Sequence, residues 1–393
     1  MKQDTLITTA GRDPENNKGF VNPPVYHAST ILSGSLKERQ EKSERRWEVG
    51  TYTYGRQGTP THDALEIAVS KLLGGDRAVA MSSGLAAINA AMLAFLEAGD
   101  HVLMVDSVYG PARNFCNNFL ARFGVETTYY DPSIGAGIAD LIQDNTRIVY
   151  TESPGSLTFE VQDIRAIADA AHERDCVVIM DDTWSSGVFF KPFEHGVDVS
   201  AIAATKYIVG HSDVMMGIIT TTEEHWPRVR PSASALGANS GPDDVYLALR
   251  GLRTIGIRMR QHHENGLKLA RYLVDRPEVV NIMHPGMPND PGHELWKRDF
   301  TGACGLFGVE LRKDISEDAI AAMVDDLEYF GIGSSWGGFE SLILRTNPGS
   351  IRVATNERWA NAGPTLRIHA GLEDPEDLIE DLDKGFKRLN GEK

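Results

Sequence analysis

The chain has 393 residues, of which 41% are hydrophobic and 24% are charged, and its formal net charge is −16. This composition is typical of a water-soluble globular protein that is long enough for two or three domains. The acidic balance, without a long run of lysine and arginine, argues against nucleic acids and anionic membrane surfaces as partners.

Targeting signals and cysteine motifs are not found. The first residues contain no apolar core long enough for a signal peptide, and the longest apolar run, residues 85–96, is too short to span a bilayer. We therefore expect a cytoplasmic protein. Its three cysteines, Cys116, Cys176 and Cys304, show no CxxC spacing and are expected to be small, reduced core residues.

Residues 1–60 are rich in glycine, proline, asparagine and charged residues, and they show no sustained periodicity. We expect an extended arm here, with a short helix at residues 39–47. Because the arm carries Trp47, Tyr52 and Tyr54, we expect it to pack against another surface, such as a second subunit.

From residue 61 onward, short apolar segments alternate with helical ones. This alternation predicts an α/β fold with a mainly parallel sheet between helices, in which ligands bind at the carboxyl ends of the strands. The predicted strands lie near residues 77–81, 101–105, 125–130, 147–151, 176–181, 199–203 and 214–220. The predicted helices lie at residues 62–73, 84–97, 110–123, 161–174 and 243–274.

The last third of the chain changes to an α+β pattern, which predicts a smaller second domain. Its predicted strands are residues 302–311, 342–346 and 365–370, and its predicted helices are residues 316–330 and 375–389. We therefore expect three parts: an arm over residues 1–60, a large α/β domain over 61–256 and a C-terminal domain over 257–393.

A carboxylate and a lysine follow two of the predicted strands. Asp181 closes the strand 176–181, and Lys206 lies in the apolar stretch ATKYIVG. The pair is typical of a pyridoxal phosphate (PLP) site, where the lysine carries the cofactor as a Schiff base and the aspartate keeps its ring nitrogen protonated. A surface lysine and an aspartate in a turn are the ordinary alternatives. Asp182 fits the turn role better, because strand alternation points it away from Asp181.

A phosphate cradle is predicted at residues 82–87, SSGLAA, which follow a strand and open a helix. The backbone N–H groups of Gly84 and Leu85 lie at the positive end of that helix and suit a phosphate. Thr205 is a candidate for a further hydroxyl donor. Taken alone, such a helix start is equally an ordinary cap.

Two more residues are candidates for this site, and Tyr109 is expected on the same rim as Gly84 and Asp181. Tyr109, just past the strand 101–105, can stack on a planar ring, although a tyrosine at a helix start is also routine. Arg367 lies inside an apolar strand and needs an anionic partner, either a substrate carboxylate or an acidic side chain. The glycine-rich loop 334–342 is placed to complete the pocket.

The loop 52–61 is dense in polar and aromatic residues. Its Tyr54 and Arg56 are residue types that contact phosphate, and its place in the arm makes it a candidate for donation across an interface. Other chemistry is not supported: no GxxxxGK[ST] motif occurs, and the pair His262–His263 lacks companions at zinc spacing. We expect these two histidines on a solvated helix face.

Together these motifs resemble those of the Cys/Met metabolism family of PLP-dependent enzymes. The resemblance covers nearly the whole chain and implies PLP as cofactor and the type I fold of PLP-dependent transferases, with an N-terminal arm, a PLP-binding domain and a smaller C-terminal domain. The motifs, in chain order, are YTYGRQGTPT from residue 52, SSGLAA from 82, VYGP from 108, DDTW from 181, ATKYIVGHSD from 204, SWGGFESL from 335 and LRIHAGLED from 366.

The resemblance also implies a role for each candidate residue. The implied catalytic residues are Lys206, Tyr109 and Asp181. The implied cofactor contacts are Gly84, Leu85, Tyr109, Asp181, Thr205 and Lys206, with Tyr54 and Arg56 donated by the neighbouring subunit. The implied substrate contacts are Ser335, Trp336 and Arg367. The family assembles as a homotetramer of two catalytic dimers, which is the assembly we expect here.

The implied activity is β-elimination of cystathionine to homocysteine, pyruvate and ammonia, a step of methionine biosynthesis, with cystine-like thioethers as further substrates. Lys206 or Tyr109 would protonate the departing sulfur. The γ-synthase, γ-lyase and sulfhydrylase activities of the family share the cofactor residues and stay open. A non-catalytic PLP-binding regulator is the remaining alternative.

Three positions depart from the family pattern. Leu85 replaces a common methionine, which is neutral if only its backbone N–H is used. Asp182 replaces a frequent asparagine and is expected to add charge near the ring. Ala203 replaces a serine of many relatives, so we expect one phosphate contact fewer.

Overall fold

The structure, a computed structural model, describes residues 1–392. Its larger sheet has seven strands in the order β1-β7-β6-β5-β4-β2-β3. Four neighbouring pairs are parallel, and β7 runs antiparallel to both β1 and β6. The bounds are β1 Arg77–Met81, β2 His101–Val105, β3 Glu126–Tyr130, β4 Thr146–Glu152, β5 Val177–Asp181, β6 Val199–Ile202 and β7 Gly217–Thr221. All seven predicted strands are confirmed, as is the mainly parallel α/β fold.

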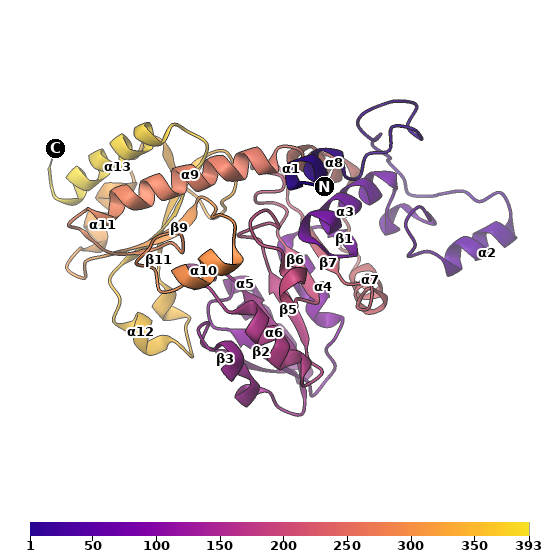
Figure 1. Cartoon of the computed structure of the whole chain (residues 1–393), viewed down its shortest axis with the longest axis horizontal. Coiled ribbons are helices and arrows are strands. Elements are labelled where there is room, and N and C mark those ends of the chain that lie inside the picture. The colour runs from indigo at the N-terminus through magenta and orange to yellow at the C-terminus, as the bar shows by residue number, and fades with distance from the viewer. Residues whose placement is uncertain (393) are drawn as a thin grey trace.

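Helices pack on both sides of this sheet (Figure 1). They are α3 Pro60–Leu73, α4 Gly84–Leu93, α5 Gly110–Asn114, α6 Ile164–His172, α7 Trp226–Ala235 and α8 Pro242–Leu252. The predicted helix 110–123 begins as α5 and continues through a π-helical turn at Phe115–Phe119 and a 3₁₀ turn at Leu120–Phe123. The helix α7 was not predicted, because Pro231 inside it interrupts the sequence pattern.

The single helix predicted at 243–274 is wrong, because α8 ends at Leu252 and α9 runs from Ile255 to Val274. The Arg253 guanidinium between them donates to the carbonyl oxygens of Ile7 at 2.8 Å and Ala10 at 2.7 Å. These contacts with the first helix, α1 Gln3–Thr9, favour a bend that the periodicity of 243–274 does not encode. The first residues therefore pack on the body of the protein instead of extending as an arm.

The second sheet has five strands in the order β10-β11-β12-β9-β8, with only β10 and β11 parallel. The bounds are β8 Val279–Met283, β9 Leu306–Leu311, β10 Phe330–Ile332, β11 Ser341–Thr346 and β12 Thr365–His369, with helices α10 His293–Asp299, α11 Glu317–Val324, α12 Asn356–Ala360 and α13 Pro375–Leu389. The predicted helix 316–330 is too long. The Asp381 carboxylate on α13 accepts the N–H groups of Glu328 and Tyr329 and holds that segment outside the helix.

Each sheet has its own hydrophobic core, and α9 joins them. Ile255 and Met259 at its start pack in the core of the larger sheet, whereas Leu269 and Leu273 pack in that of the smaller one. Figure 1 shows α9 running from α1 to the C-terminal sheet. The three cysteines are buried and unpaired, as predicted. The boundaries 60/61 and 256/257 stay a prediction.

The arm after α1 projects from the body and carries α2 Leu36–Glu44 near its tip (Figure 1). Its helix begins three residues earlier than predicted because Ser35 caps it, accepting the N–H of Glu38 at 3.1 Å. Several large apolar side chains of the arm are exposed: Phe20, Val21, Leu32 and Leu36. Among residues 1–392, no helix combines the length and apolarity needed to cross a membrane.

Candidate active site

A cavity of about 480 Å³ opens between the two sheets, at the carboxyl ends of the parallel strands. Its walls come from segments far apart in sequence, because β5, the start of α4 and the loop after β6 meet the strand β12 and the loop before β11 there. Of the predicted site residues, those that line it are Gly84, Leu85, Tyr109, Asp181, Thr205, Lys206, Trp336 and Arg367.

Asp181 ends β5 and faces the cavity. One carboxylate oxygen accepts the N–H of Thr183 at 2.9 Å and also its hydroxyl. Burial raises the pKa of Asp181, while the Thr183 bonds and the charge of Lys206 oppose that rise. A buried acid fixed in this way is suited to one tightly held cationic N–H group, as the protonated ring nitrogen of PLP would provide.

Asp182 points the other way, as strand alternation predicts. Its carboxylate accepts the N–H of Gly187 at 2.9 Å, and the residue does not line the cavity. Burial raises the pKa of Asp182 well above its usual range. The expectation that Asp182 adds charge near the ring is therefore wrong, because its side chain is buried on the opposite side of the strand and favours the neutral form.

These neighbouring acids give a matched test. We expect Asp181→Asn to lower kcat by at least about 100-fold, because a neutral amide no longer favours the protonated ring. We expect Asp182→Asn to stay within about twofold of the unchanged protein, since Asp182 lies outside the cavity and an amide oxygen can still accept the Gly187 N–H. Turnover of both purified variants measures the contrast, and equal losses would contradict the opposite orientation of the two side chains.

The start of α4 forms the predicted cradle. Ser83 caps the helix by accepting the N–H of Ala86 at 3.1 Å, and the first-turn N–H groups of Gly84 and Leu85 have no acceptor within the helix. A Cβ atom on Gly84 would lie 2.5 Å from the Cβ of Ala203. Only glycine therefore lets the helix start approach the loop before Lys206, and this donor set fits the phosphate of PLP.

Thr205 lines the cavity, but its hydroxyl is already used. The Oγ1 atom donates to the carbonyl of Met216 at 3.1 Å and accepts the N–H of Met216 at 2.8 Å. The hydroxyl of Thr205 therefore braces the loop, and its O–H is not free for the phosphate in this arrangement.

We expect Gly84→Ala to weaken cofactor binding by about tenfold or more, because the overlap with Ala203 costs about 1–3 kcal/mol. Titration of the apoprotein with PLP, followed by absorbance, measures the affinity. Leu85→Met keeps the same backbone N–H and serves as the control, which we expect to bind PLP as the unchanged protein does. An unaltered affinity in Gly84→Ala would contradict the cradle.

Lys206 follows β6 at the floor of the cavity. Its Nζ donates to Ser335 Oγ at 2.7 Å and lies 5.4 Å from the centre of the Trp336 ring. Burial, and then the nearby Arg367, lower the pKa of Lys206 to about 8, while Asp181 acts against that shift. At pH 7 about a tenth of this amine is then neutral, far more than for an ordinary lysine, as Schiff-base chemistry requires.

Tyr109 stands at the rim, 42% exposed, and its backbone N–H donates to Glu152 Oε2 at 2.6 Å. Burial and the charges of Asp181 and Glu152 raise the pKa of its phenol. Glu152 was missed from the sequence, although it ends β4 as Asp181 ends β5, and the two are register partners. Burial raises the pKa of Glu152 well above its usual range.

Arg367 lies on β12 and binds no acidic side chain in residues 1–392, which removes the salt-bridge alternative. Its Nη2 atom donates to the carbonyls of Gly333 at 3.2 Å and of Ser334 and Ser335 at 3.1 Å. The rest of the guanidinium group has no hydrogen-bond partner within the described chain. Arg367 therefore holds the loop beside Lys206 and still has N–H groups for a carboxylate.

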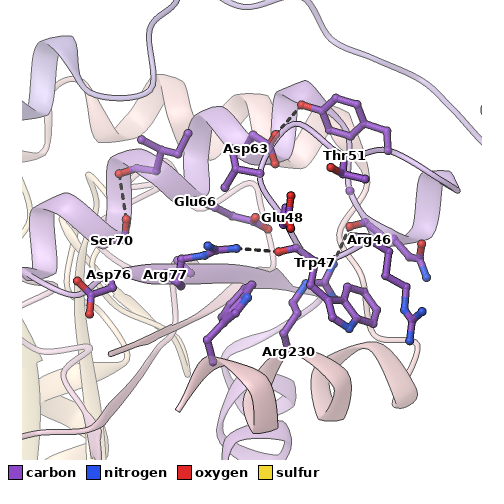
Figure 2. A pocket seen from close by; sticks show the side chains of 17 residues that line it. Arg46, Trp47, Glu48, Thr51, Asp63, Glu66, Ser70, Asp76, Arg77 and Arg230 are labelled. Carbon is purple, nitrogen blue, oxygen red and sulfur yellow. Dashed lines mark hydrogen bonds between the residues drawn. The ribbon is translucent and has the colours of Figure 1, made fainter. Parts of the chain in front are cut away.

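The loop with Tyr54 and Arg56 does not reach this cavity. Figure 2 shows where it is anchored: Arg77 donates to the carbonyl of Trp47 at 2.7 Å, and the Arg230 guanidinium lies 4.5 Å from the Trp47 ring. Beyond this anchor Tyr54 is 47% exposed, and Arg56 donates to the carbonyl of Ser234 at 2.7 Å.

The predicted solvated face at His262–His263 is also wrong. His262 is fully buried, and His263 is half-buried with its Nδ1 accepting the N–H of Ala303 at 3.0 Å. The helix α9 is amphipathic, and His262 lies on its buried side, which faces β12.

The fold and the cavity define a PLP-dependent enzyme of fold type I. The chain belongs to the family described as Cys/Met metabolism PLP-dependent enzyme, whose sequence profile matches residues 4–387. It is 43% identical to the cystathionine β-lyase of Escherichia coli over 99% of each chain. It is 40% identical to an L-alanine/L-glutamate racemase of Wolbachia pipientis, over 99% of this chain and 98% of that one.

Among solved structures, the chain resembles cystathionine γ-lyase from Lactobacillus plantarum in complex with L-serine. The TM-score is 0.89 at 29% identity, over 99% of this chain and all of that one. The whole chain, and not one domain alone, therefore follows the architecture of this family.

Proposed function

We propose that this chain cleaves cystathionine by β-elimination and releases homocysteine, pyruvate and ammonia, with the consumption of one water molecule. The observation that carries the proposal is a full-length likeness to a cystathionine β-lyase at 43% identity, together with a cavity that joins Lys206, Asp181 and Arg367. The γ-lyase structure is more distant, at 29% identity.

Each side chain has a task that its geometry supports. PLP, when bound, supplies an electron-withdrawing ring that stabilises negative charge at the substrate α-carbon. Arg367 orients the substrate carboxylate, and Asp181 favours a proton on the ring nitrogen. The Lys206 amine takes the α-proton and delivers it to the sulfur as the carbon–sulfur bond breaks, with Tyr109 as the alternative donor. Trp336 shields this side of Lys206 from water.

A product assay tests the reaction. We expect the purified holoenzyme to form pyruvate from cystathionine, with little 2-oxobutyrate. Predominant 2-oxobutyrate would instead assign a γ-elimination, and activity that requires a thiol co-substrate would assign a sulfhydrylase. PLP absorbance without turnover would assign a non-catalytic regulator. Cystine and djenkolate in the same assay measure substrate breadth.

Racemisation of alanine or glutamate is a second candidate, favoured by the likeness to the Wolbachia racemase. It shares the removal of the α-proton by Lys206, but alanine has no β-substituent to lose, so the proton returns to carbon. Chiral chromatography after incubation with L-alanine tests this, with D-alanine as the supporting result and its absence as the contrary one.

The proposal includes assembly into catalytic dimers, paired as a homotetramer, in the cytoplasm. In it, Tyr54 and Arg56 of each subunit reach the phosphate of the neighbouring subunit. The exposure of Tyr54, the anchoring of its loop by Trp47 and the exposed apolar residues of the arm support this arrangement. Light scattering measures the assembly, and cell fractionation measures the location.

Mixed assemblies test the shared site. We expect Arg56→Ala and Lys206→Ala to be strongly impaired when each is pure, but to regain activity when the two are unfolded and refolded together. Some sites then combine an intact Lys206 with an intact Arg56 from the other subunit. The same experiment with Lys206→Ala and Asp181→Asn is the control, because both changes lie in the same cavity wall. Equal recovery in the two mixtures, or none in the first, would contradict donation across the interface.

A further inference from the structure

Two buried histidines lie behind the loop that covers Lys206. His262 on α9 and His369 on β12 are 0% and 1% exposed, and their ring centres are 5.1 Å apart. Both contact the ring of Tyr207, which follows Lys206 in sequence, at 5.1 and 5.9 Å between ring centres. Burial lowers the pKa of His262 to about 4 and that of His369 well below its usual range, so both rings are neutral.

His369 holds the loop through Gly337. This glycine has φ +83°, and a Cβ on it would lie 3.0 Å from the backbone and Cβ of Lys206. The loop therefore rests directly on Lys206, with Ser335 and Trp336 just before the point of contact. The Gly337 N–H donates to His369 Nε2 at 3.1 Å. A ring nitrogen on β12 thus fixes the segment that positions the two residues beside the Lys206 amine.

The bond to Gly337 requires one tautomer of His369. An N–H group only donates, so Nε2 must be unprotonated and the proton must sit on Nδ1. The same Nε2 lies 3.2 Å from the carbonyl of Gly338, which would need the opposite tautomer. Whichever tautomer is present, Nε2 therefore bonds to this loop, through the Gly337 N–H or through the Gly338 carbonyl.

His262 is in ring contact with His369 but forms its hydrogen bond elsewhere. Its Nδ1 lies 2.9 Å from the carbonyl of Ala370, which only accepts, so Nδ1 carries the proton and Nε2 keeps a lone pair. That Nε2 and the Nδ1 of His369 are both buried without a hydrogen-bond partner in the described chain. The two histidines therefore touch without a hydrogen bond between them, and the bond that holds the loop belongs to His369 alone.

We propose that His369 is a positioning residue for carbon–sulfur cleavage: its Nε2 holds the loop at Gly337 and Gly338 and so places Ser335 and Trp336 against Lys206. Arg367, two residues earlier on β12, binds the same loop through the carbonyls of residues 333–335. The strand therefore holds the loop at two points, one beside the substrate carboxylate and one behind the lysine. The kinetic part of the test rests on the proposed function, whereas the position of the loop does not.

Two variants separate the hydrogen bond from packing. In His369→Gln, the side-chain amide reaches the place of Nε2 and can accept the Gly337 N–H or donate to the Gly338 carbonyl, whereas His369→Leu fills the space without a polar group. His263→Asn on α9 is the control, because its amide oxygen can still accept the Ala303 N–H.

We expect His369→Leu to lower kcat/KM by about tenfold, with unchanged PLP content and thermal midpoint, and His369→Gln to retain most of the activity. Crystal structures should show the segment 334–338 displaced from Lys206 in His369→Leu and in place in His369→Gln. A loop that keeps its position in His369→Leu would overturn the proposal whatever the reaction is. Failure of His369→Gln to exceed His369→Leu would overturn the hydrogen bond as the cause.

Discussion

Lys206→Ala is expected to abolish pyruvate release from cystathionine, with kcat lower by at least about 10³-fold. Lys206 is the one amine in the cavity wall among the described residues, and its pKa of about 8 makes it the group that can take a proton from carbon and return it to sulfur. The variant should still fold, because the Lys206 Nζ makes only one hydrogen bond, to Ser335. Turnover and thermal unfolding of the same preparation measure the two effects.

Lys268→Ala is the control for Lys206→Ala. Its amine forms an ion pair with Glu376 on the surface, and Lys268 does not line the cavity. Its loss should therefore leave turnover unchanged. Pyruvate release from Lys206→Ala at an undiminished rate would remove the lysine from the proposed proton transfers. Excess methylamine offers a further check, since partial rescue by a free amine is expected if the missing group acts as a base.

Arg367→Lys is expected to lower kcat/KM for cystathionine by about 100-fold, which corresponds to about 2.7 kcal/mol. An ammonium group cannot bind the loop carbonyls and a carboxylate together, because it lacks the planar arrangement of donors that the guanidinium has. Most of the loss should appear as a higher KM, since the substrate carboxylate is bound in the ground state as well as in the transition state. Steady-state kinetics over a range of substrate concentrations separate the two parameters.

Arg345→Lys is the matched control on the neighbouring strand β11. Arg345 forms a surface ion pair with Glu317 and lies outside the cavity, so kcat/KM should stay within about twofold. A normal KM in Arg367→Lys would show that the arginine serves only to hold the loop. In that case the substrate carboxylate would need another cation in the cavity.

Sequence patterns correctly predicted the helices and strands whose bounds depend on residues that are close in the sequence. The strands of the larger sheet were found because they are short, apolar and separated by helical segments, and α13 was found because Asp374 caps its start. The failures fall where distant residues intervene. Arg253 ends α8 by contacts with Ile7 and Ala10, and Asp381 ends α11 by accepting the amides of Glu328 and Tyr329.

The residues of the functional site also divide into those that the sequence predicted and those that only the structure revealed. Motifs predicted Gly84, Asp181, Lys206 and Arg367, and all four line one cavity. The sequence did not reveal Glu152, the inward orientation of His262 or the use of the Thr205 hydroxyl by Met216. Tyr54 and Arg56 remain a prediction, since a single chain does not bring them to its own cavity.

By itself, the sequence determined the class of chemistry: an acid at the end of β5 and a lysine after β6, placed by strand periodicity and by the topology of parallel sheets. Only the tertiary structure decided which residues surround that lysine and so set its pKa and its hydrogen bond. Ser335 lies 129 positions from Lys206, and Ala370 lies 108 positions from His262, yet each pair is in hydrogen-bond contact. Periodicity and capping act within a few residues, whereas burial, tautomers and pKa shifts depend on neighbours that only the packing of the two sheets brings together.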